Sequence, residues 1–427
     1  MKIKSSILFT ITLSTTLSAL QFQTIGYKSI SMGGAAVASS ASSTAVYNNP
    51  ALLAKSVEKV EVSLGLGIAG YDHGAGASYQ ALMNSDFEDA MDEADENVDN
   101  LSQNTINTLF DSRDIILNID KKGFELSPQG YIGAQVYEYG FGIFTTSDIV
   151  AVANISQIHD QLIFENNDIG YQKILENGNI VSSNQTEYDS TSLEAGITDG
   201  YTYFDAIGIV LTEVPIAYSH SFELSQGLLH VGGALKYMNA ITYVETILLD
   251  DEENNNEDSR QDETSSNFGI DLGVAYEPYF VKNLTLGLVI KNLNSPKFGT
   301  VGKDITIDPM VRIGAAYNIN KELEVALDID VTSNKTLIPG LDSQTIGGGI
   351  NYMPVDWFSI RGGLMTNISS KDKAGMVYTA GMGIGPQWLQ IDLSAQISGS
   401  STDVDVDGDD YSYPQYAKVN LALISRW

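Results

Sequence analysis

The sequence contains no cysteine, and this absence excludes several kinds of chemistry at once. Without thiols the chain forms no disulfide, thiolate metal site or cysteine nucleophile, and it carries no lipid on an N-terminal cysteine. Histidine is scarce too, and His73, His159, His220 and His230 show no HExxH or other ligand spacing. A hydrolase assembled from distant loops stays open as an alternative, but no motif points to one. We therefore predict no enzymatic activity.

Positive charge is also in short supply, with 23 Lys and Arg against 54 Asp and Glu, which gives a net charge of −31. This balance excludes a nucleic-acid interface, which needs basic residues clustered on one face. It also makes contact with anionic phosphate surfaces depend on divalent cations.

Long apolar runs are missing after the first twenty residues, so no later segment could cross a membrane as a helix of ~20 apolar residues. Residues 1–19 read as a signal peptide, with Lys2 and Lys4 ahead of an apolar run and with Ala19 at the expected cleavage site. We therefore expect an exported protein. If it is in a membrane, it crosses as strands.

The last stretch, from Gln415 to Trp427, alternates between apolar and polar residues almost without exception. An edge strand of a soluble sheet could alternate in this way, but a final strand that ends on an aromatic residue is typical of outer-membrane barrels. The same pattern recurs along the chain. It predicts strands near 60–68, 127–136, 139–152, 203–218, 228–244, 266–277, 283–292, 309–318, 321–331, 344–353, 356–366, 375–384, 387–397 and 415–427.

The connections between these fourteen strands alternate in length, which is stronger evidence than the strands themselves. Those after even-numbered strands are short, and aromatic residues collect beside them. Those after odd-numbered strands are longer and polar. Short periplasmic turns and long outer loops distinguish a bacterial outer-membrane barrel from a soluble sandwich. The sequence thus predicts an all-β fold, a 14-stranded antiparallel transmembrane barrel over residues 57–427, with both termini in the periplasm.

Residues 20–56 are rich in small side chains and contain the strings SMGGAAVA and YNNPALLA. These strings resemble the N-terminal hatch of the FadL family, outer-membrane channels for hydrophobic compounds, and are more similar still to the conjugal-transfer TraF-like barrel family. The resemblance implies an N-terminal hatch that contains Gly33, Gly34, Asn49, Pro50 and Ala51. It also implies passive uptake of a hydrophobic small molecule across the outer membrane of a Gram-negative bacterium.

The resemblance leaves a second class of function open. The barrel could instead be a structural or interaction component of an envelope or conjugal-transfer assembly, without transport activity. Either function implies contact with outer-membrane lipid, lipopolysaccharide and the barrel-assembly machinery.

One strand changes phase, because Ile207, Ile209 and Leu211 lie on one parity and Val214 and Ile216 on the other. This predicts a β-bulge near Thr212 and Glu213, with Pro215 beyond it unable to donate a hydrogen bond. The bulge is interpreted first as a structural kink. The sharper hypothesis is a lateral opening in the wall.

Two further patterns concern the outer loop and the barrel interior. Apolar residues at helical spacing in the loop 72–124 predict a helix pair at the outer mouth, packed on neighbouring loops. Strand parity directs charges of both signs into the barrel, which predicts a lumen filled by ion pairs and the hatch. These charged residues are Glu61, Lys236, Asp271, Lys291, Arg312, Glu324, Asp328, Asp330, Arg361, Asp392, Lys418 and Arg426.

The loop 398–414 has carboxylates at every second position, namely Asp403, Asp405, Asp407 and Asp409, with Gly408 among them. This spacing resembles the start of a calcium loop, although Pro414 stands where a glutamate ligand is expected. The alternative is a solvated acidic loop. If calcium binds, calorimetry will give a binding isotherm that the double variant Asp405→Asn, Asp407→Asn loses. A parent protein that gives no heat would leave the solvated loop.

Removal of Trp427 is expected to impair membrane assembly far more than Trp388→Ala, since the last aromatic strand of an outer-membrane barrel serves as its assembly signal, whereas Trp388 is one interfacial aromatic among several. The surface level of each variant in cells measures the effect. Equal levels of the two variants would contradict it.

Overall fold

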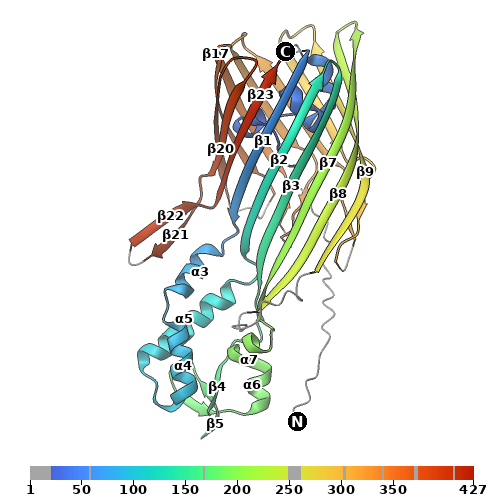
Figure 1. The fold of residues 1–427 in the computed structure, drawn as a ribbon. Coiled ribbons are helices and arrows are strands. Elements are labelled where there is room, and N and C mark those ends of the chain that lie inside the picture. Colours follow the sequence, from blue (N-terminus) through green and yellow to red (C-terminus); the bar gives the residue numbers. More distant parts are fainter. Residues whose placement is uncertain are drawn as a thin grey trace.

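The computed structural model describes residues 21–56, 59–166, 169–248, 261–301, 304–338, 341–369, 374–406 and 409–427, and the predicted signal peptide lies outside them. Fourteen strands form a closed antiparallel barrel in which the last strand pairs with the first (Figure 1). The wall consists of β1 (Val60–Asp72), β2 (Gly123–Val136), β3 (Tyr139–Asn154), β7 (Tyr203–Leu224), β8 (Gly227–Leu248), β9 (Gln261–Pro278), β10 (Leu284–Lys291), β13 (Met310–Asn318), β14 (Leu323–Asp330), β17 (Thr345–Val355), β18 (Phe358–Asn367), β19 (Met376–Ile384), β20 (Gln390–Ser398) and β23 (Tyr416–Arg426).

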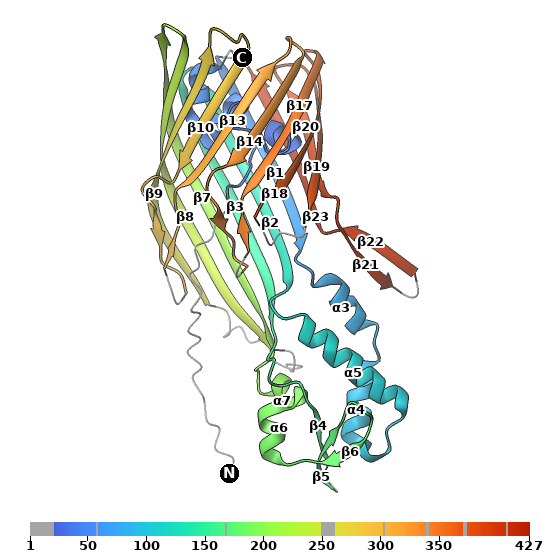
Figure 2. The same cartoon turned by 180° about the vertical axis from the view of Figure 1, so that it is seen from behind.

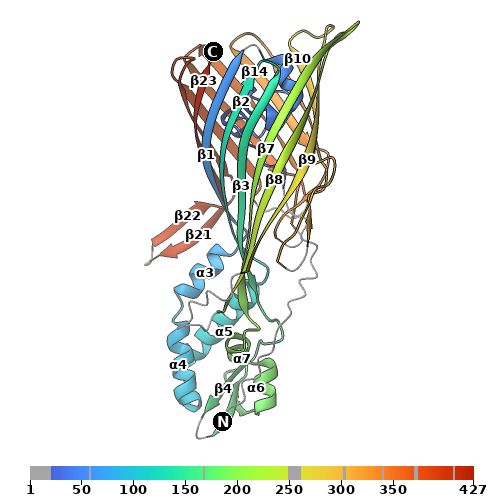
Figure 3. The same ribbon diagram turned by 45° about the vertical axis from the view of Figure 1, so that its right-hand side comes forward.

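The predicted number of strands and their order are confirmed, but several strands are longer than predicted. Strands β7 and β8 have 22 residues each, and their apolar alternation covers only part of that length. At ~3.3 Å per residue each is roughly 70 Å long. A strand that only crosses the membrane needs about 9–11 residues. The wall is therefore much taller on this side than at β13 and β14 (Figure 3).

Side chains in the wall alternate between an apolar outer face and a mixed inner face. In β23, Val419, Leu421 and Leu423 are exposed, whereas Lys418 and Asn420 are buried. Ile424 is an apolar residue on the mostly polar face of this strand, and its side chain points inward against Tyr27. The outer face thus presents an apolar band around the barrel, with exposed aromatic side chains beside the short turns, as the sequence predicted. These aromatic residues include Tyr279, Phe280, Tyr317, Tyr352, Trp357, Trp388 and Trp427.

The first two long connections fold together into a compact module at the end of the barrel opposite the C-terminus (Figure 1). The first connection supplies α3 (Gly76–Met83), α4 (Phe87–Asn97), a short 3-10 turn η2 (Val98–Asn100) and α5 (Gln103–Asn118). The second supplies the three-stranded sheet β4 (Leu162–Asn166), β5 (Gly170–Ile174) and β6 (Ile180–Ser182), then α6 (Gln185–Thr191) and α7 (Leu193–Thr198). The prediction of a helix pair was thus too simple, because the first connection contains three α-helices.

The module has its own apolar core, in which Leu109 and Ile116 of α5 pack with Phe164 and Leu193 from the second connection. This confirms that the apolar stripe of the first loop packs on a neighbouring loop. Helices α5 and α7 begin at capping side chains, since Ser102 accepts a hydrogen bond from the N–H of Thr105 and Ser192 from that of Ala195. None of the described helices is long and apolar enough to cross a membrane.

Three of the remaining long connections form small hairpins at the same end of the barrel. They are β11 (Lys297–Phe298) with β12 (Ile305–Thr306), β15 (Asn334–Lys335) with β16 (Asp342–Ser343), and β21 (Ser401–Val406) with β22 (Asp409–Pro414). The first two turn inward, where Ile305, Leu337 and Ile338 are buried against Ile207 and Ile209 of β7. The lumen near this mouth is therefore apolar on the side of β7.

Residues 21–56, called the inner segment from here on, lie within the barrel near the end that carries the C-terminus (Figure 2). The segment contains α1 (Tyr27–Ser31), α2 (Ser42–Asn48) and the 3-10 helix η1 (Pro50–Lys55). Its elements contact strands on opposite sides of the lumen, with α1 against β19 and β20 and η1 against β7, β8 and β9. Its action as a hatch belongs to the proposed function below.

Candidate interior site

Small residues let the backbone of the inner segment lie directly on the wall. A Cβ atom at Gly33 would lie 2.3 Å from the carbonyl oxygen of Leu364, and one at Gly347 would lie 2.0 Å from the carbonyl oxygen of Gly33. Gly33 and Gly34 also have positive φ angles, of 64° and 81°, which other residues rarely adopt. Gly33 thus serves this close contact and the glycines of β17 form its other half, whereas Gly34 serves the turn through its positive φ angle.

Asn49, Pro50 and Ala51 seat the other end of the inner segment. The Asn49 side chain accepts a hydrogen bond from the N–H of Ala51 and donates one of 2.7 Å to the carbonyl oxygen of Val37. Pro50 begins η1, where its missing N–H has no partner to lose. In the wall, a Cβ at Gly273 would lie 2.0 Å from Asn49 Oδ1, so this strand glycine makes room for the turn.

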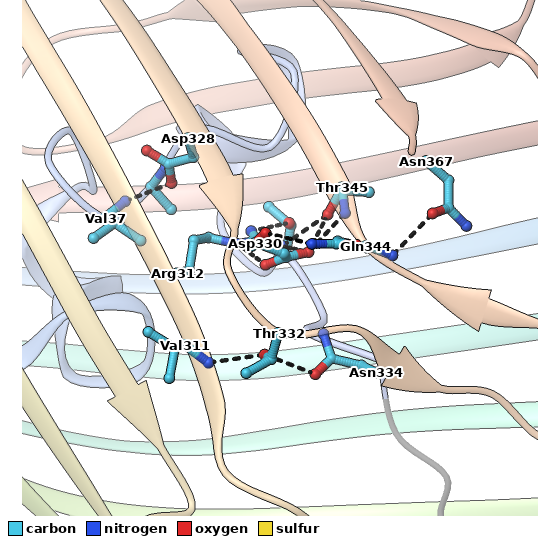
Figure 4. Close-up of polar contacts among 12 residues, drawn as sticks. Val37, Val311, Arg312, Asp328, Asp330, Thr332, Asn334, Gln344, Thr345 and Asn367 are labelled. Atoms are coloured by element: carbon cyan, nitrogen blue, oxygen red, sulfur yellow. Dashed lines mark hydrogen bonds and ion pairs between the residues drawn. The ribbon is translucent and has the colours of Figure 1, made fainter. Parts of the chain in front are cut away.

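Two inward carboxylates hold the backbone of the inner segment. Asp328 of β14 accepts hydrogen bonds from the N–H groups of Ala36 and Val37, at 2.7 and 2.8 Å (Figure 4). Glu61 of β1 accepts bonds from the N–H and hydroxyl of Ser43, at 2.9 and 2.6 Å. Hydrogen bonds to a carboxylate are about twice as strong as neutral ones, so these contacts are the firmest polar links between segment and wall.

Most of the other inward charges form ion pairs, as strand parity predicted, whereas Lys291 and Lys418 form none among the described residues. Arg312 donates two bonds to Asp330, at 2.6 and 3.0 Å, in the fork geometry that suits a guanidinium (Figure 4). Further ion pairs join Lys236 to Glu213 and Asp271, Arg361 to Asp392, Arg426 to Glu61 and Lys28 to Glu324. Lys291 lies over the ring of Tyr47 instead, 3.2 Å from the ring centroid. The lumen is thus filled by compensated charge.

A cavity of about 120 Å³ remains between the start of the inner segment and the mouth that carries the long loops. Its lining mixes aromatic and charged side chains, among them Phe22, Tyr71, His73, Glu125, Tyr416 and Lys418. A cavity whose lining combines apolar surface with convergent polar groups is a candidate small-molecule site. A second cavity of about 20 Å³, enough for one water molecule, lies beside Lys291 and Tyr47. Gln21 and Gln23 line both cavities and divide them.

The polar side chains around the larger cavity form two hydrogen-bonded groups, one acidic and one around Lys418. The Ser127 hydroxyl lies 2.9 Å from both Glu125 Oε1 and Asp148 Oδ1 and joins the two carboxyl groups. His73 Nε2 is 3.0 Å from Glu125 Oε2, and Lys418 Nζ donates to Gln129 at 2.9 Å. The ring of Tyr71 lies between those of His73 and Tyr416, with centroids 3.8 and 5.8 Å away. Charge and aromatic surface therefore meet at the same place.

Sequence reasoning found Lys418 but missed its partners in this cavity. Tyr71 and Glu125 lie on the inner face where β1 and β2 extend beyond the predicted strand ends. Their inward parity was a usable signal, but both residues lie outside the predicted strands 60–68 and 127–136. Phe22 and Gln23 belong to the predicted hatch, and no pattern indicated that they line a cavity.

The predicted β-bulge in β7 is wrong. The pairing of β7 with β8 keeps one register from Tyr203↔Leu248 to Leu224↔Gly227. The apolar phase changes for another reason: Ile207, Ile209 and Leu211 face the apolar part of the lumen, whereas Val214 and Ile216 face outward.

The three residues named for a lateral opening have different surroundings. Thr212 lies in the ladder between β7 and β3, and its hydroxyl is 3.1 Å from that of Thr145. Glu213 is buried and paired with Lys236. At Pro215 the β3 ladder is interrupted: it passes from Phe141↔Ile216 to Phe144↔Glu213 and skips two residue pairs. Since proline has no N–H to donate, this part of the wall has weaker strand pairing, and the opening itself stays a prediction.

The proposed calcium ligands lie in the hairpin β21–β22. Asp403 and Asp405 are in β21 and Asp409 is in β22, while Asp407 lies outside the described residues. Among the side chains that the structure describes, no group of three or more His, Asp or Glu is placed to hold a metal ion. The side chains of residues 404–411 are not among them. Calcium binding by this loop thus stays a prediction.

The closed 14-stranded barrel with a buried inner segment is the fold of known hydrocarbon channels. The chain is similar to the toluene transporter TbuX of Ralstonia pickettii, at a TM-score of 0.50 and 13% identity over 95% of this chain and 99% of that one. It is similar to the toluene transporter TodX of P. putida at a TM-score of 0.50 and 12% identity, with the same coverage. At such low identity these likenesses establish the FadL-like fold alone.

Residues 46–330 match the family described as "F plasmid transfer operon, TraF, protein". Because the match covers most of the chain, the protein belongs to this family. The chain is thus a FadL-like barrel of the TraF family, as the resemblance predicted. No curated protein sequence matches it.

Asp328→Asn is expected to loosen the inner segment without opening the barrel. The amide keeps one acceptor but loses the charge, so the bonds from Ala36 and Val37 weaken and their amides exchange with solvent about fivefold to tenfold faster. Hydrogen-exchange mass spectrometry of the peptide 33–40 measures this rate. Asp356→Asn, at an exposed turn, is the matched control. Unchanged exchange at Ala36 and Val37 in Asp328→Asn would show that these bonds do not hold the segment.

Proposed function

We propose that the protein is a passive uptake channel for hydrophobic small molecules in the outer membrane of a Gram-negative bacterium. In this function the inner segment is a hatch that closes the lumen, and the cavity beside Tyr71 and Lys418 is the interior binding site. The signal peptide at residues 1–19 exports the chain, and the barrel-assembly machinery inserts it with both termini in the periplasm.

The observation that carries this proposal is an interior cavity between the inner segment and the outer loops. On the mouth side the cavity adjoins Thr336 and Leu341 of an inward-folded loop, and on the inner side it adjoins Gln21 to Thr24 of the inner segment. A purely structural barrel has no need of an interior site of this kind. The likeness in fold to two toluene transporters supports the same class of function.

The apolar outer band supports the membrane placement. Along β9 the outward side chains are apolar from Phe268 to Tyr276, eight residue steps that cover about 27 Å of strand. At a tilt of about 40° this gives roughly 20 Å of height, close to the ~25 Å apolar band of outer-membrane barrels. Lipid and lipopolysaccharide then surround the wall, and the interrupted ladder at Pro215 is the proposed lateral opening.

The module favours a second candidate function, an interaction barrel of an envelope assembly without transport. Its separate core and its place beyond the long strands β7 and β8 would present it away from the membrane (Figure 3). We place this candidate second because it gives no role to the interior cavity.

Deleting Ile30 to Tyr47 is expected to convert a closed barrel into an open channel. The wall strands pair with each other and not with this segment, so the barrel will still assemble. Conductance in planar bilayers will rise from near zero to that of an open pore, since the removed residues fill the lumen.

Two measurements make this test decisive. Heat-modifiable migration on gels shows that the deletion variant has assembled, and liposomes that contain the parent protein report uptake of a hydrophobic probe. A deletion variant as silent as the parent would mean that the inner segment is not the hatch. Parent liposomes that take up no hydrophobic probe would favour the interaction barrel.

A further inference from the structure

We propose that the interior cavity selects small ring compounds that carry a hydroxyl group over the corresponding hydrocarbons. This inference rests on the proposed function and narrows its substrate class. It follows from the size of the cavity, the side chains that line it and the hydrogen-bonding capacity that the protein leaves open there.

Size restricts the ligand to about one ring. The cavity holds about 120 Å³, and an engineered protein cavity of roughly 150 Å³ is known to take up benzene. A long acyl chain does not fit beside the inner segment in this position. The aromatic rings of Tyr71, Tyr416 and Phe22 in the cavity lining also favour a ring compound, because aromatic rings pack well edge to face or offset.

The acidic side of the cavity has more acceptors than donors. The Ser127 hydroxyl is within 2.9 Å of both Glu125 and Asp148, but it has one proton and donates to one carboxylate at a time. Gln23 donates to Asp148 at 3.2 Å, and His73 is the partner of the other Glu125 oxygen. A carboxylate oxygen at the cavity wall thus has room for a further donor, which a ligand can supply.

The basic side of the cavity has a donor to spare. Lys418 is 6% exposed, and its ammonium group has three N–H donors. Among the described residues its hydrogen bonds go to Gln129 at 2.9 Å and to the carbonyl oxygen of Thr24 at 3.5 Å, the second being long. At least one donor is therefore available to an acceptor in the cavity.

A hydroxyl group matches both sides because it donates one hydrogen bond and accepts another. A hydrocarbon of the same shape would displace solvent from Glu125 and Lys418 without replacing the hydrogen bonds that the solvent makes. Leaving a buried charged group without these hydrogen bonds is unfavourable in free energy. A carboxylate ligand would place a third negative charge beside Glu125 and Asp148. Of these ligand types, a hydroxylated ring fits best.

Fluorine NMR with the purified barrel in nanodiscs tests the choice directly. The probes are para-fluorophenol and para-fluorotoluene, which differ only by a hydroxyl in place of a methyl group, and empty nanodiscs correct for partition into lipid. We expect para-fluorophenol to bind about tenfold to a hundredfold more tightly, the ratio given by one hydrogen bond to a charged group.

The outcomes separate this inference from the proposed function. Equal or tighter binding of para-fluorotoluene would overturn the selectivity and leave the channel intact. Binding of neither probe would remove the interior site, and with it both proposals.

Variants locate the effect within the cavity. Lys418→Met and Glu125→Gln are each expected to bring the ratio of the two affinities close to one. In each variant the affinity for para-fluorotoluene should change less than threefold. Lys282→Met and Glu138→Gln, at exposed turns, are the matched controls and should keep the parent ratio. Heat-modifiable migration on gels checks that each variant has assembled. The comparison of the two probes on the parent protein does not depend on the variants. If both variants assemble and keep the affinity ratio of the parent protein, Lys418 and Glu125 do not bind the hydroxyl group.

Discussion

Every backbone N–H and C=O group of the wall has to find its partner on a neighbouring strand, because apolar side chains cover the outside of the barrel and keep water away. Closure of β23 onto β1 meets this requirement around the whole circumference. The ladders on both sides of β3 skip residue pairs, at Pro128 of β2 and at Pro215 of β7. Both prolines keep the register while removing a donor, so the wall is continuous in shape but locally weaker in pairing.

The same constraint frees the inner face to vary, since the strands do not depend on it for hydrogen bonding. Charges of both signs occupy it, and each buried charge needs a partner because the lumen offers little solvent. Pairs such as Arg312–Asp330 meet this need within the wall, whereas Asp328 and Glu61 meet it with the backbone of the inner segment. Wall glycines at 273 and 347 give the segment the space to come that close. Segment and wall are thus fitted to each other residue by residue.

Strand number, strand order, loop asymmetry and the inward charges were all predictable, since each depends on the two-residue period of a strand and little else. Strand ends and the regular register of β7 were not. The period reports which face a residue occupies only while one face is apolar, and in β7 the inner face itself becomes apolar where Ile207 and Ile209 meet Ile305 and Leu337. Side chains from distant loops cause this change.

The cavity was unpredictable for a related reason: its lining comes from β1, β2, β17 to β20, β23, an outer loop and the inner segment, which only the closed barrel brings together. Lys418 was identified by parity, but Glu125, Ser127 and Asp148 were not linked to it. A single chain read in order contains no measure of how close two strands lie across a lumen. Pairing rules give each strand its two neighbours and nothing about the opposite wall.

The two ends of the inner segment differ in how they are held, and this difference decides where a hatch could move first. Gly33 and the Asn49 turn pack directly against wall glycines. A shift of either part of the inner segment therefore requires the wall backbone to shift as well. Gln21 to Thr24 contact the wall through side chains, such as Gln23 with Asp148 and the Phe22 ring below Arg312. Side chains change rotamer far more readily than packed backbones separate. Since Gln21 and Gln23 also divide the two cavities, a small rearrangement there would join the ligand site to the space beside Lys291 while Gly33 stays seated on the wall.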